Sequence, residues 1–290
     1  MKILVLGGTR FFGIPMLEKL IEGGHDVTVA TRGLSRNPFE NSTEQLLMDR
    51  TDYDSVRHTL AGKEYDLIID KIAYCSNDVR NLLENVRCKK YIQMSSCSVY
   101  SEDKLNISES DFDQSGHKLV WMNRTEDYAE GKRQAEKAAL EYIDETGCVF
   151  VRYPVVMGEN DYTGRLKFYV DHVAAGKPIY VDNPDFGMQF IHEKEAGHFL
   201  AYLAGKDVYG AINGTSKNMI SSGDIVGFIE KVIGKKAIIS PDGDAAPYNG
   251  SRADISYDTR KAESIGFHFS DINDWIYGLI KQLTEGDLWD

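Results

Sequence analysis

The chain has 290 residues, of which 27% are charged and 42% hydrophobic, and its formal net charge is −12. A chain of this size folds without disulfides or metal. Its apolar runs are shorter than the roughly 18 residues of a membrane helix, and the one at the N-terminus is too short for a signal peptide. The acidic charge argues against a nucleic-acid partner, so we expect a cytoplasmic protein that binds neither nucleic acid nor membrane.

The first half of the chain alternates short β-rich runs with amphipathic helical runs. Strands are predicted at residues 2–6, 26–31, 45–48, 66–70, 90–95 and 148–152, and helices at 12–23, 52–61, 77–87 and 126–145. Such alternation is typical of βαβ units, in which helices cover both faces of one parallel sheet. The sequence therefore predicts an α/β fold with a Rossmann-type, doubly wound parallel sheet.

The pattern loosens after residue 153. Residues 187–214 return to strand-helix-strand character, and residues 255–284 are predicted to be mostly helical. We predict a dinucleotide-binding Rossmann domain over residues 1–158, to which residues 187–214 return. A smaller C-terminal substrate lobe is predicted from residues 159–186 and 215–290, with the ligand site in the cleft between the two parts.

The segment GGTRFFG connects the first strand to the first helix. Two glycines permit a sharp turn, a third lets the helix pack closely, and the helix N-terminus attracts a diphosphate. The predicted dinucleotide-binding residues are Gly7, Gly8, Thr9, Arg10, Phe11, Phe12 and Gly13. Arg10 stands where a further glycine would let the backbone approach a phosphate. Its side chain either points to solvent or, as we favour, binds a phosphate.

The second strand ends in Thr31 and Arg32, at the position where an acidic residue would bind the ribose hydroxyl of NAD. Arg32 can instead bind the 2′-phosphate of NADP, so we predict NADP, with NAD as the alternative. The competing interpretation is that Arg32 is a solvated loop residue. Asp49, after the third strand, either accepts a hydrogen bond from the adenine amino group or caps the next helix.

Tyr128 and Lys132 are four residues apart in a predicted helix, so they share one face. A nearby ammonium favours the phenolate and lowers the pKa of the tyrosine, which lets the pair move a proton at a carbonyl or carbinol oxygen. Ser96 ends a strand at the carboxyl edge of the sheet, where ligands bind, and is the candidate that polarises the reacting oxygen. The competing role for serines here is capping, which we expect of Ser95 or Ser98.

In this order the motifs resemble those of extended and atypical short-chain dehydrogenase/reductases, that is, the NAD-dependent epimerase/dehydratase family. The family's serine four residues before the tyrosine of a Val-Tyr pair falls on Ser96, and its Tyr-x-x-x-Lys falls on Tyr128 and Lys132. The similarity covers nearly the whole chain, because it continues through residues 152–158, 190–195, 212–213 and 258–261. The GGTRFFG loop is similar to that of an atypical subgroup with a GGxxxxG loop.

The resemblance implies a nicotinamide cofactor that exchanges hydride with a small-molecule substrate, such as a sugar or a nucleotide sugar. It also implies that Lys132 contacts the nicotinamide ribose and that Ile72, Ala73 and Tyr153 border the cofactor. Reduction and epimerisation use the same three catalytic residues, so both reactions stay open, and a homodimer is compatible with the family. The alternative is a non-catalytic NAD(P)-binding or RNA-associated member.

The chain departs from the family pattern at several positions. Asp70 and Lys71 open the segment that is His-x-Ala-Ala in the family, and we interpret them as a mutually paired structural element. Val155 replaces an asparagine that contacts the diphosphate of nucleotide sugars, which weakens the expectation of that substrate class. Arg165 and Arg252 are either anion ligands or surface cations, and residues 101–127 are expected to form a loop over the site.

Overall fold

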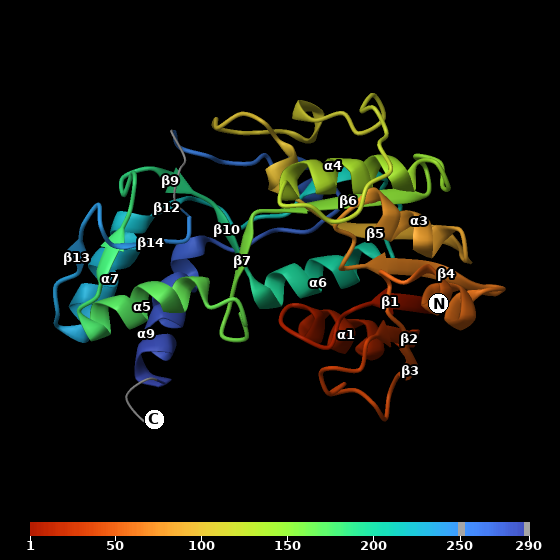
Figure 1. Ribbon diagram of the computed structural model, residues 1–290, viewed down its shortest axis with the longest axis horizontal. Coiled ribbons are helices and arrows are strands. Elements are labelled where there is room, and N and C mark those ends of the chain that lie inside the picture. The colour runs from red at the N-terminus through yellow and green to blue at the C-terminus, as the bar shows by residue number, and fades with distance from the viewer. Residues whose placement is uncertain (249–252, 287–290) are drawn as a thin grey trace.

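A computed structural model describes residues 1–248 and 253–286. Two parts lie side by side along the long axis, a larger one around a sheet and a smaller one that contains the C-terminal helix (Figure 1). No helix among the described residues is long and apolar enough to cross a membrane. The four cysteines are free, and three of them are buried.

A seven-stranded sheet, all of whose strand pairs are parallel, forms the centre of the larger part, in the order β11-β6-β5-β4-β1-β2-β3. The strands are β1 (Lys2–Leu6), β2 (Asp26–Thr31), β3 (Glu44–Leu47), β4 (Lys63–Asp70), β5 (Val86–Ser96), β6 (Cys148–Tyr153) and β11 (Gly210–Asn213). The register places Leu6 beside Ala30 and Asp70, so three strands end at one edge. This order is that of a doubly wound sheet, and the predicted fold class is confirmed.

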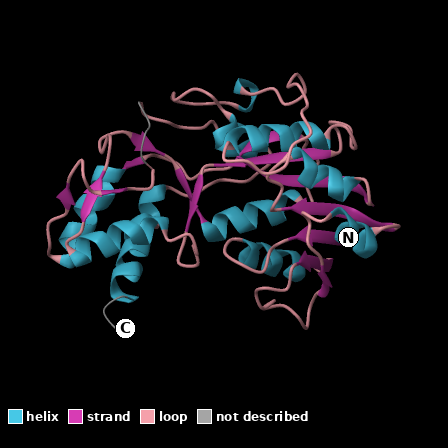
Figure 2. Ribbon diagram, in the orientation of Figure 1, coloured by secondary structure: helices cyan, strands magenta, loops and turns pink. Residues whose placement is uncertain are grey.

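Helices cover both faces of this sheet (Figure 2). The first face carries α1 (Gly13–Glu22) and α6 (Glu193–Leu203), and the second carries α2 (Tyr53–Leu60), α3 (Ser76–Leu83) and α4 (Tyr128–Ala139). Successive strand residues point to opposite faces, so Ile3 and Val5 join the first core cluster while Leu4 and Leu6 join the second. Helix α4 ends before residue 145, where the sequence predicted its end.

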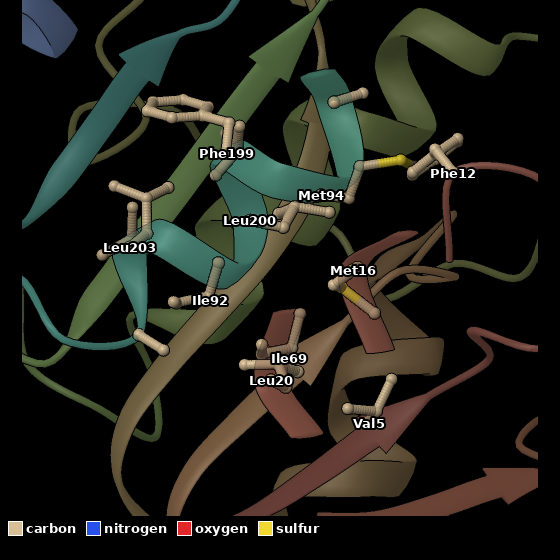
Figure 3. Close-up of a cluster of buried hydrophobic side chains, with 14 of the residues drawn as sticks. Val5, Phe12, Met16, Leu20, Ile69, Ile92, Met94, Phe199, Leu200 and Leu203 are labelled. Carbon is tan, nitrogen blue, oxygen red and sulfur yellow. The ribbon is translucent and has the colours of Figure 1, made fainter. Parts of the chain in front are cut away.

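Figure 3 shows part of the first cluster, in which Val5 and Ile69 of the sheet lie near Met16 and Leu20 of α1 and Leu200 of α6. All five side chains are fully buried. Complete burial of one such side chain contributes roughly 1.5–3 kcal/mol. The tight packing of α1 against the sheet fixes the position of the loop that precedes it.

The smaller part has its own core cluster, formed mainly by three helices. Its elements are α5 (Arg165–Ala175), β8 (Pro178–Tyr180), β9 (Gly187–Met188), β12 (Ile220–Ser221), α7 (Ser222–Ile233), β13 (Ile238–Ile239), β14 (Asp244–Ala245) and α9 (Ile276–Gly286). Strand β8 pairs with β13 and β14, and β9 pairs with β12. Strands β7 (Val155–Met157) and β10 (Phe190–His192) form a pair that lies between the two parts (Figure 1).

One segment of the predicted C-terminal lobe lies instead with the sheet. Helix α8 (Arg260–Ser264) contacts β11, and Phe269 is 3% exposed in the first core cluster. The rings of Phe267 and Phe269 lie 4.7 and 4.9 Å from that of Phe199, centroid to centroid. Residues 260–269 therefore belong to the larger part, because these aromatic rings fill its core. Residues 265–271 are also not helical, contrary to the predicted helical character of 255–284.

Candidate active site

A cavity of about 920 Å³ lies at the carboxyl edge of the sheet and extends to the smaller part. Of the predicted site residues, its lining includes Gly7, Gly8, Thr9, Arg10, Phe11, Phe12, Thr31, Arg32, Asp49, Ile72, Ser96, Tyr128 and Tyr153. Gly13, Ala73 and Lys132 are not part of the lining. The hydroxyl of Tyr153 is not directed at the cavity, because it donates to the Ala196 carbonyl at 2.7 Å within the core. Arg252 lies outside the described residues.

The GGTRFFG loop needs its glycines for two reasons. Gly7 and Gly8 have φ values of 80° and 109°, a region that residues with a side chain rarely adopt. A Cβ on Gly13 would lie 2.4 Å from the Gly8 Cα, so only glycine lets the helix start this close to the strand end. Phe11 also has positive φ, at 53°. Its strained backbone is held by a ring that packs in the core.

The loop presents unpaired backbone donors. Among the described residues, the N–H groups of Thr9, Arg10, Phe11 and Phe12 donate to no other protein group. Successive free N–H groups before a helix form a concave anion site, to which the helix dipole adds partial positive charge. The loop therefore fits the diphosphate of a dinucleotide. The guanidinium of Arg10 borders the cavity and stacks 3.8 Å above the ring of Tyr162, which belongs to the smaller part.

Arg32 and Asp49 line the end of the cavity that lies beyond β2 and β3. Asp49 Oδ1 accepts from the Thr51 N–H at 2.9 Å and from the Thr51 hydroxyl at 2.7 Å. These hydrogen bonds, with a smaller contribution from Arg32, lower the pKa of Asp49. The cap of α2 is Asp52, which accepts from the Asp54 N–H at 3.0 Å, so a capping role for Asp49 is wrong.

Ser96 has both of its lone pairs occupied. Its Oγ accepts from the N–H of Ser98 at 3.1 Å and from the hydroxyl of Ser98 at 2.9 Å, and it caps the 3₁₀ turn of residues 97–99. The prediction that Ser95 or Ser98 makes this cap is therefore wrong, and the Ser95 hydroxyl donates to Glu136 instead. A hydroxyl with two accepted hydrogen bonds has only its proton left to give.

Tyr128 opens α4 and is 44% exposed as a whole residue. Desolvation of its hydroxyl raises the pKa of Tyr128 to about 12, and the hydrogen bond with Ser96 and the charge of Arg165 act in the opposite direction. The phenol is therefore protonated at neutral pH. We predicted a pKa lowered by Lys132, and the structure shows the reverse.

Lys132 is fully buried behind the cavity wall. Its Nζ donates to the carbonyls of Ala73 at 2.7 Å and Met94 at 3.0 Å, and it lies 5.7 Å from the Tyr128 ring centroid. Desolvation lowers the pKa of Lys132 to about 7. An ammonium that is itself desolvated and directed at two carbonyls has little effect on the Tyr128 phenol, which explains why the predicted pKa direction was wrong.

Asp70 and Lys71 do not pair with each other. Asp70 is fully buried, forms an ion pair with Arg50 and accepts from the Tyr91 hydroxyl at 2.9 Å. Lys71 lies on the other side of the sheet and borders the cavity, with its Nζ 3.5 Å from the centroid of the Phe12 ring. The predicted pair is wrong because consecutive residues at a strand end point to opposite faces.

Sequence reasoning missed two residues that border the cavity beside Tyr128. The ring of Tyr74 lies 6.2 Å from that of Tyr128 and 4.7 Å from Lys132 Nζ. Arg124 forms an ion pair with Asp78 at 3.0 Å and stacks 4.5 Å above Tyr74. Tyr74 follows Ala73 directly, and this neighbourhood could have identified it. No local pattern marks Arg124, which comes from a segment without a motif.

The segment of residues 101–127 covers the site only in part. Glu102, Asp103 and Ile107, near its start, and Arg124, near its end, line the cavity. Between them the chain turns away, and the Val120 N–H donates to the Gln134 side chain of α4 at 2.7 Å. The expectation of one loop over the site therefore holds for its two ends alone.

Comparisons with known proteins show a matching family profile and a curated relative. The sequence profile of the NAD dependent epimerase/dehydratase family matches residues 3–84 and 72–213. The chloroplast stem-loop binding protein of 41 kDa b of Arabidopsis thaliana is 29% identical over 212 residues, which are 68% of this chain and 52% of that protein. The chain thus spans about half the length of this curated relative.

Two solved structures of UDP-glucose 4-epimerases share the fold. The enzyme of Thermus thermophilus, in complex with NAD, superposes with a TM-score of 0.69 and 17% identity, covering 98% of this chain and 99% of the other. The enzyme of Thermotoga maritima, with UDP-glucose, gives a TM-score of 0.73 and 16% identity, covering 99% and 100%. At such identities the similarity shows the fold.

Proposed function

Because the chain belongs to the NAD-dependent epimerase/dehydratase family, we propose that it is an NAD(P)-dependent oxidoreductase or epimerase. Its substrate is a small molecule with a carbonyl or carbinol group, in the class of sugars and nucleotide sugars. The observation that carries the proposal is that Ser96 and Tyr128 line the same cavity as the GGTRFFG loop. The UDP-glucose 4-epimerases that share the fold support the substrate class.

The residues that would hold the cofactor are residues 7–12 of the loop together with Thr31, Arg32, Asp49, Ile72 and Tyr153. When bound, a nicotinamide ring supplies or accepts the hydride at the substrate carbon. Arg32 supports NADP(H) as the preferred form, because a guanidinium binds the 2′-phosphate well. Asp49 borders the same end of the cavity. Its negative charge repels a 2′-phosphate and so reduces the preference for NADP(H).

The protonation states favour proton donation. Desolvation raises the pKa of Tyr128 to about 12, so the phenol is protonated and acts as general acid toward a carbonyl oxygen. Ser96 donates its proton to the substrate oxygen or, after transfer, to the phenolate. Lys132, whose pKa desolvation lowers to about 7, adds positive charge behind the phenol only below that pH. The free protein is therefore set for carbonyl reduction, and the reverse reaction needs the phenolate.

A direct test is to incubate the purified chain with NADPH or NADH and a panel of aldoses, ketoses and keto sugars, and to follow absorbance at the nicotinamide band. UDP-glucose is incubated in parallel with NAD⁺ or NADP⁺, and its conversion to an epimer is followed by proton NMR. Turnover in either assay supports the proposal. If the chain binds neither dinucleotide and turns over nothing, the enzyme assignment is wrong.

The second candidate is an RNA-associated protein without catalytic activity. The observation in its favour is the similarity to a protein named for stem-loop binding. The net charge of −12 stands against it, because phosphate contacts need a basic surface. A gel-shift titration with a stem-loop RNA at low and high salt separates the two candidates. Salt-sensitive binding without turnover would favour this second function.

A further inference from the structure

Lys71 is a buried cation that the proposed mechanism does not use. It is 9% exposed and follows the last residue of β4. Among the described residues it forms no ion pair with a carboxylate. Its Nζ donates to the Arg10 carbonyl at 3.3 Å and lies 3.5 Å from the Phe12 ring centroid. A long hydrogen bond and a contact with an aromatic face offset only a small part of the free-energy cost of removing an ammonium from water.

Other buried cations of the chain have stronger partners. Arg50 and Arg152 both form ion pairs with buried carboxylates, and Lys132 donates to two carbonyls. Lys71 instead lies close to a second cation, the guanidinium of Arg10 in the GGTRFFG loop, which repels it. Burial, with that repulsion, lowers the pKa of Lys71 to about 7. A negatively charged ligand would supply the counter-charge that the protein itself does not place beside Lys71.

The charges around Lys71 describe that ligand. The four free N–H groups of residues 9–12 line the same cavity as Lys71 and Arg10. Backbone donors and cations that line one cavity are suited to an oxyanion with several acceptor oxygens. Phosphate groups satisfy this need, since each offers more than one oxygen to separate donors.

We propose that Lys71 is a phosphate-binding residue, whose ammonium joins the loop N–H groups in holding the diphosphate of a bound dinucleotide. The contact with Arg10 and Phe12 of the loop favours the cofactor as the source of the phosphate. A nucleotide sugar would bring the same chemistry, and the experiment separates the two sources. The inference rests on the proposed function, because it takes a dinucleotide as ligand.

Binding rather than activity tests the proposal. Affinities for NADH, NADPH, adenosine and UDP are measured by calorimetry at pH 6.5, where Lys71 is mainly charged, for wild type, Lys71→Met and Lys71→Arg. The matched control is Lys90→Met, which removes a partly buried lysine that donates to two carbonyls and does not line the cavity. We expect Lys71→Met to weaken NADH roughly 10- to 100-fold. Adenosine binding should stay unchanged, the arginine variant should recover part of the loss, and Lys90→Met should match wild type.

The outcomes are distinct. Loss of NADH affinity alone supports the cofactor diphosphate as the source. Loss of UDP affinity with NADH unchanged supports phosphate recognition toward the substrate instead. Unchanged affinity for both, or an equal loss for adenosine, overturns the proposal. If wild type binds neither NADH nor NADPH, the proposed function fails, whereas equal NADH binding by wild type and Lys71→Met removes only this inference.

Thermal melting gives a second measurement that does not depend on tight binding. The ligand-free Lys71→Met protein should melt above wild type, because an unpaired buried cation is removed, and NADH should raise its melting temperature less. This combination also shows that the variant is folded. A variant that melts below wild type but gains the full NADH-induced shift would contradict a role in phosphate binding.

Discussion

At the residue scale, the unusual groups of the site are its two desolvated lysines and its protonated tyrosine. Burial lowers the pKa of Lys71 and of Lys132 to about 7 and raises that of Tyr128 to about 12. The lysines therefore lose their charge close to physiological pH, while the phenol keeps its proton. Ser96 and Arg165 act against the rise in the pKa of Tyr128 but do not cancel it.

The Tyr128→Phe variant tests the proposed role of Tyr128 as proton donor. Because the ring stays in place and only the hydroxyl is lost, we expect the rate of carbonyl reduction to fall by roughly 10²–10⁴ with the affinity for the dinucleotide nearly unchanged. Steady-state kinetics and a fluorescence titration measure the two quantities. Unaltered turnover would remove Tyr128 from the mechanism.

The Lys71 pKa makes a prediction about stability and pH. In the unfolded chain a lysine titrates near 10.4, so between about pH 7 and 10 the unfolded state binds the proton that folded Lys71 has released. The free energy of unfolding must then rise with pH in this window, by up to about 1.4 kcal/mol per pH unit for one group. Lys132 contributes in the same direction, whereas the raised pKa values of buried cysteines and tyrosines oppose it near the upper end.

Comparison of variants isolates this contribution. Urea unfolding of wild type and Lys71→Met at pH 7, 8 and 9, without ligand, should show a shallower slope for the variant. The stability advantage of the variant should be largest at pH 7 and should shrink as pH rises. Parallel slopes would mean that Lys71 is not desolvated as the structure indicates.

Arg32 is the residue on which the proposed preference for NADP(H) depends. Arg32→Ala should weaken NADPH by roughly tenfold or more, since a charge-assisted contact to the 2′-phosphate is lost, and should affect NADH little. Arg36→Ala is the matched control, because Arg36 lies nearby, pairs with Glu40 and does not line the cavity. An equal effect of Arg32→Ala on both cofactors would contradict the assignment.

At the element scale, α4 and the end of β4 are held together by a close backbone approach. A Cβ on Gly131 of α4 would lie 2.5 Å from the Tyr74 carbonyl oxygen. The adjacent Lys132 donates to the Ala73 carbonyl at 2.7 Å. The tyrosine and the lysine of the site thus depend on how near this helix comes to the strand end.

Gly131→Ala should therefore disturb the site from outside it. The added methyl group must push α4 away from residues 73–74, so we expect a destabilisation of roughly 1–3 kcal/mol and a loss of activity larger than the loss of dinucleotide affinity. Gly227→Ala is the matched control, because Gly227 lies inside α7 with open space around it. That variant should gain roughly 0.5–1 kcal/mol. Equal effects of the two substitutions would show that the contact is unimportant.

Arg152 explains at the same scale why residues 101–127 do not close over the cavity. The guanidinium is fully buried, pairs with Glu136 of α4, and donates to the carbonyls of Glu109 at 2.9 Å and Phe112 at 3.1 Å. The middle of the segment is therefore tied to the core beside α4. Only its two ends remain beside the cavity.

At the scale of the whole molecule, periodicity predicted the alternation of strands and helices and hence the sheet, whose carboxyl edge borders the cavity. Periodicity does not predict contacts between segments that are far apart in the sequence. The partners of Asp70 come from residues 50 and 91, and those of Lys71 from residues 10 and 12. The pKa of Tyr128 depends on desolvation by surrounding protein. No local pattern contains such information, so the residue types at the site were predictable while their charge states and partners were not.

The path of the chain makes one last prediction about cooperativity. The segment that carries Phe267 and Phe269 packs against Phe199 of the larger part, and the chain then continues into α9, whose Ile276 and Ile280 fill the core of the smaller part. Neither core is complete without this C-terminal stretch. The two parts should therefore unfold together, in one transition.

Phe269→Ala tests that coupling. Removing a ring that is 3% exposed should cost roughly 3–5 kcal/mol and shift the whole unfolding curve, although the site of the change lies in the larger part. Far-UV circular dichroism reports on both parts, and the fluorescence of Trp275 reports on the smaller one, provided Trp121 and Trp289 are replaced by phenylalanine. Coincident curves that shift together follow from the shared segment, whereas a Trp275 transition that keeps its wild-type midpoint would mean that the smaller part folds independently.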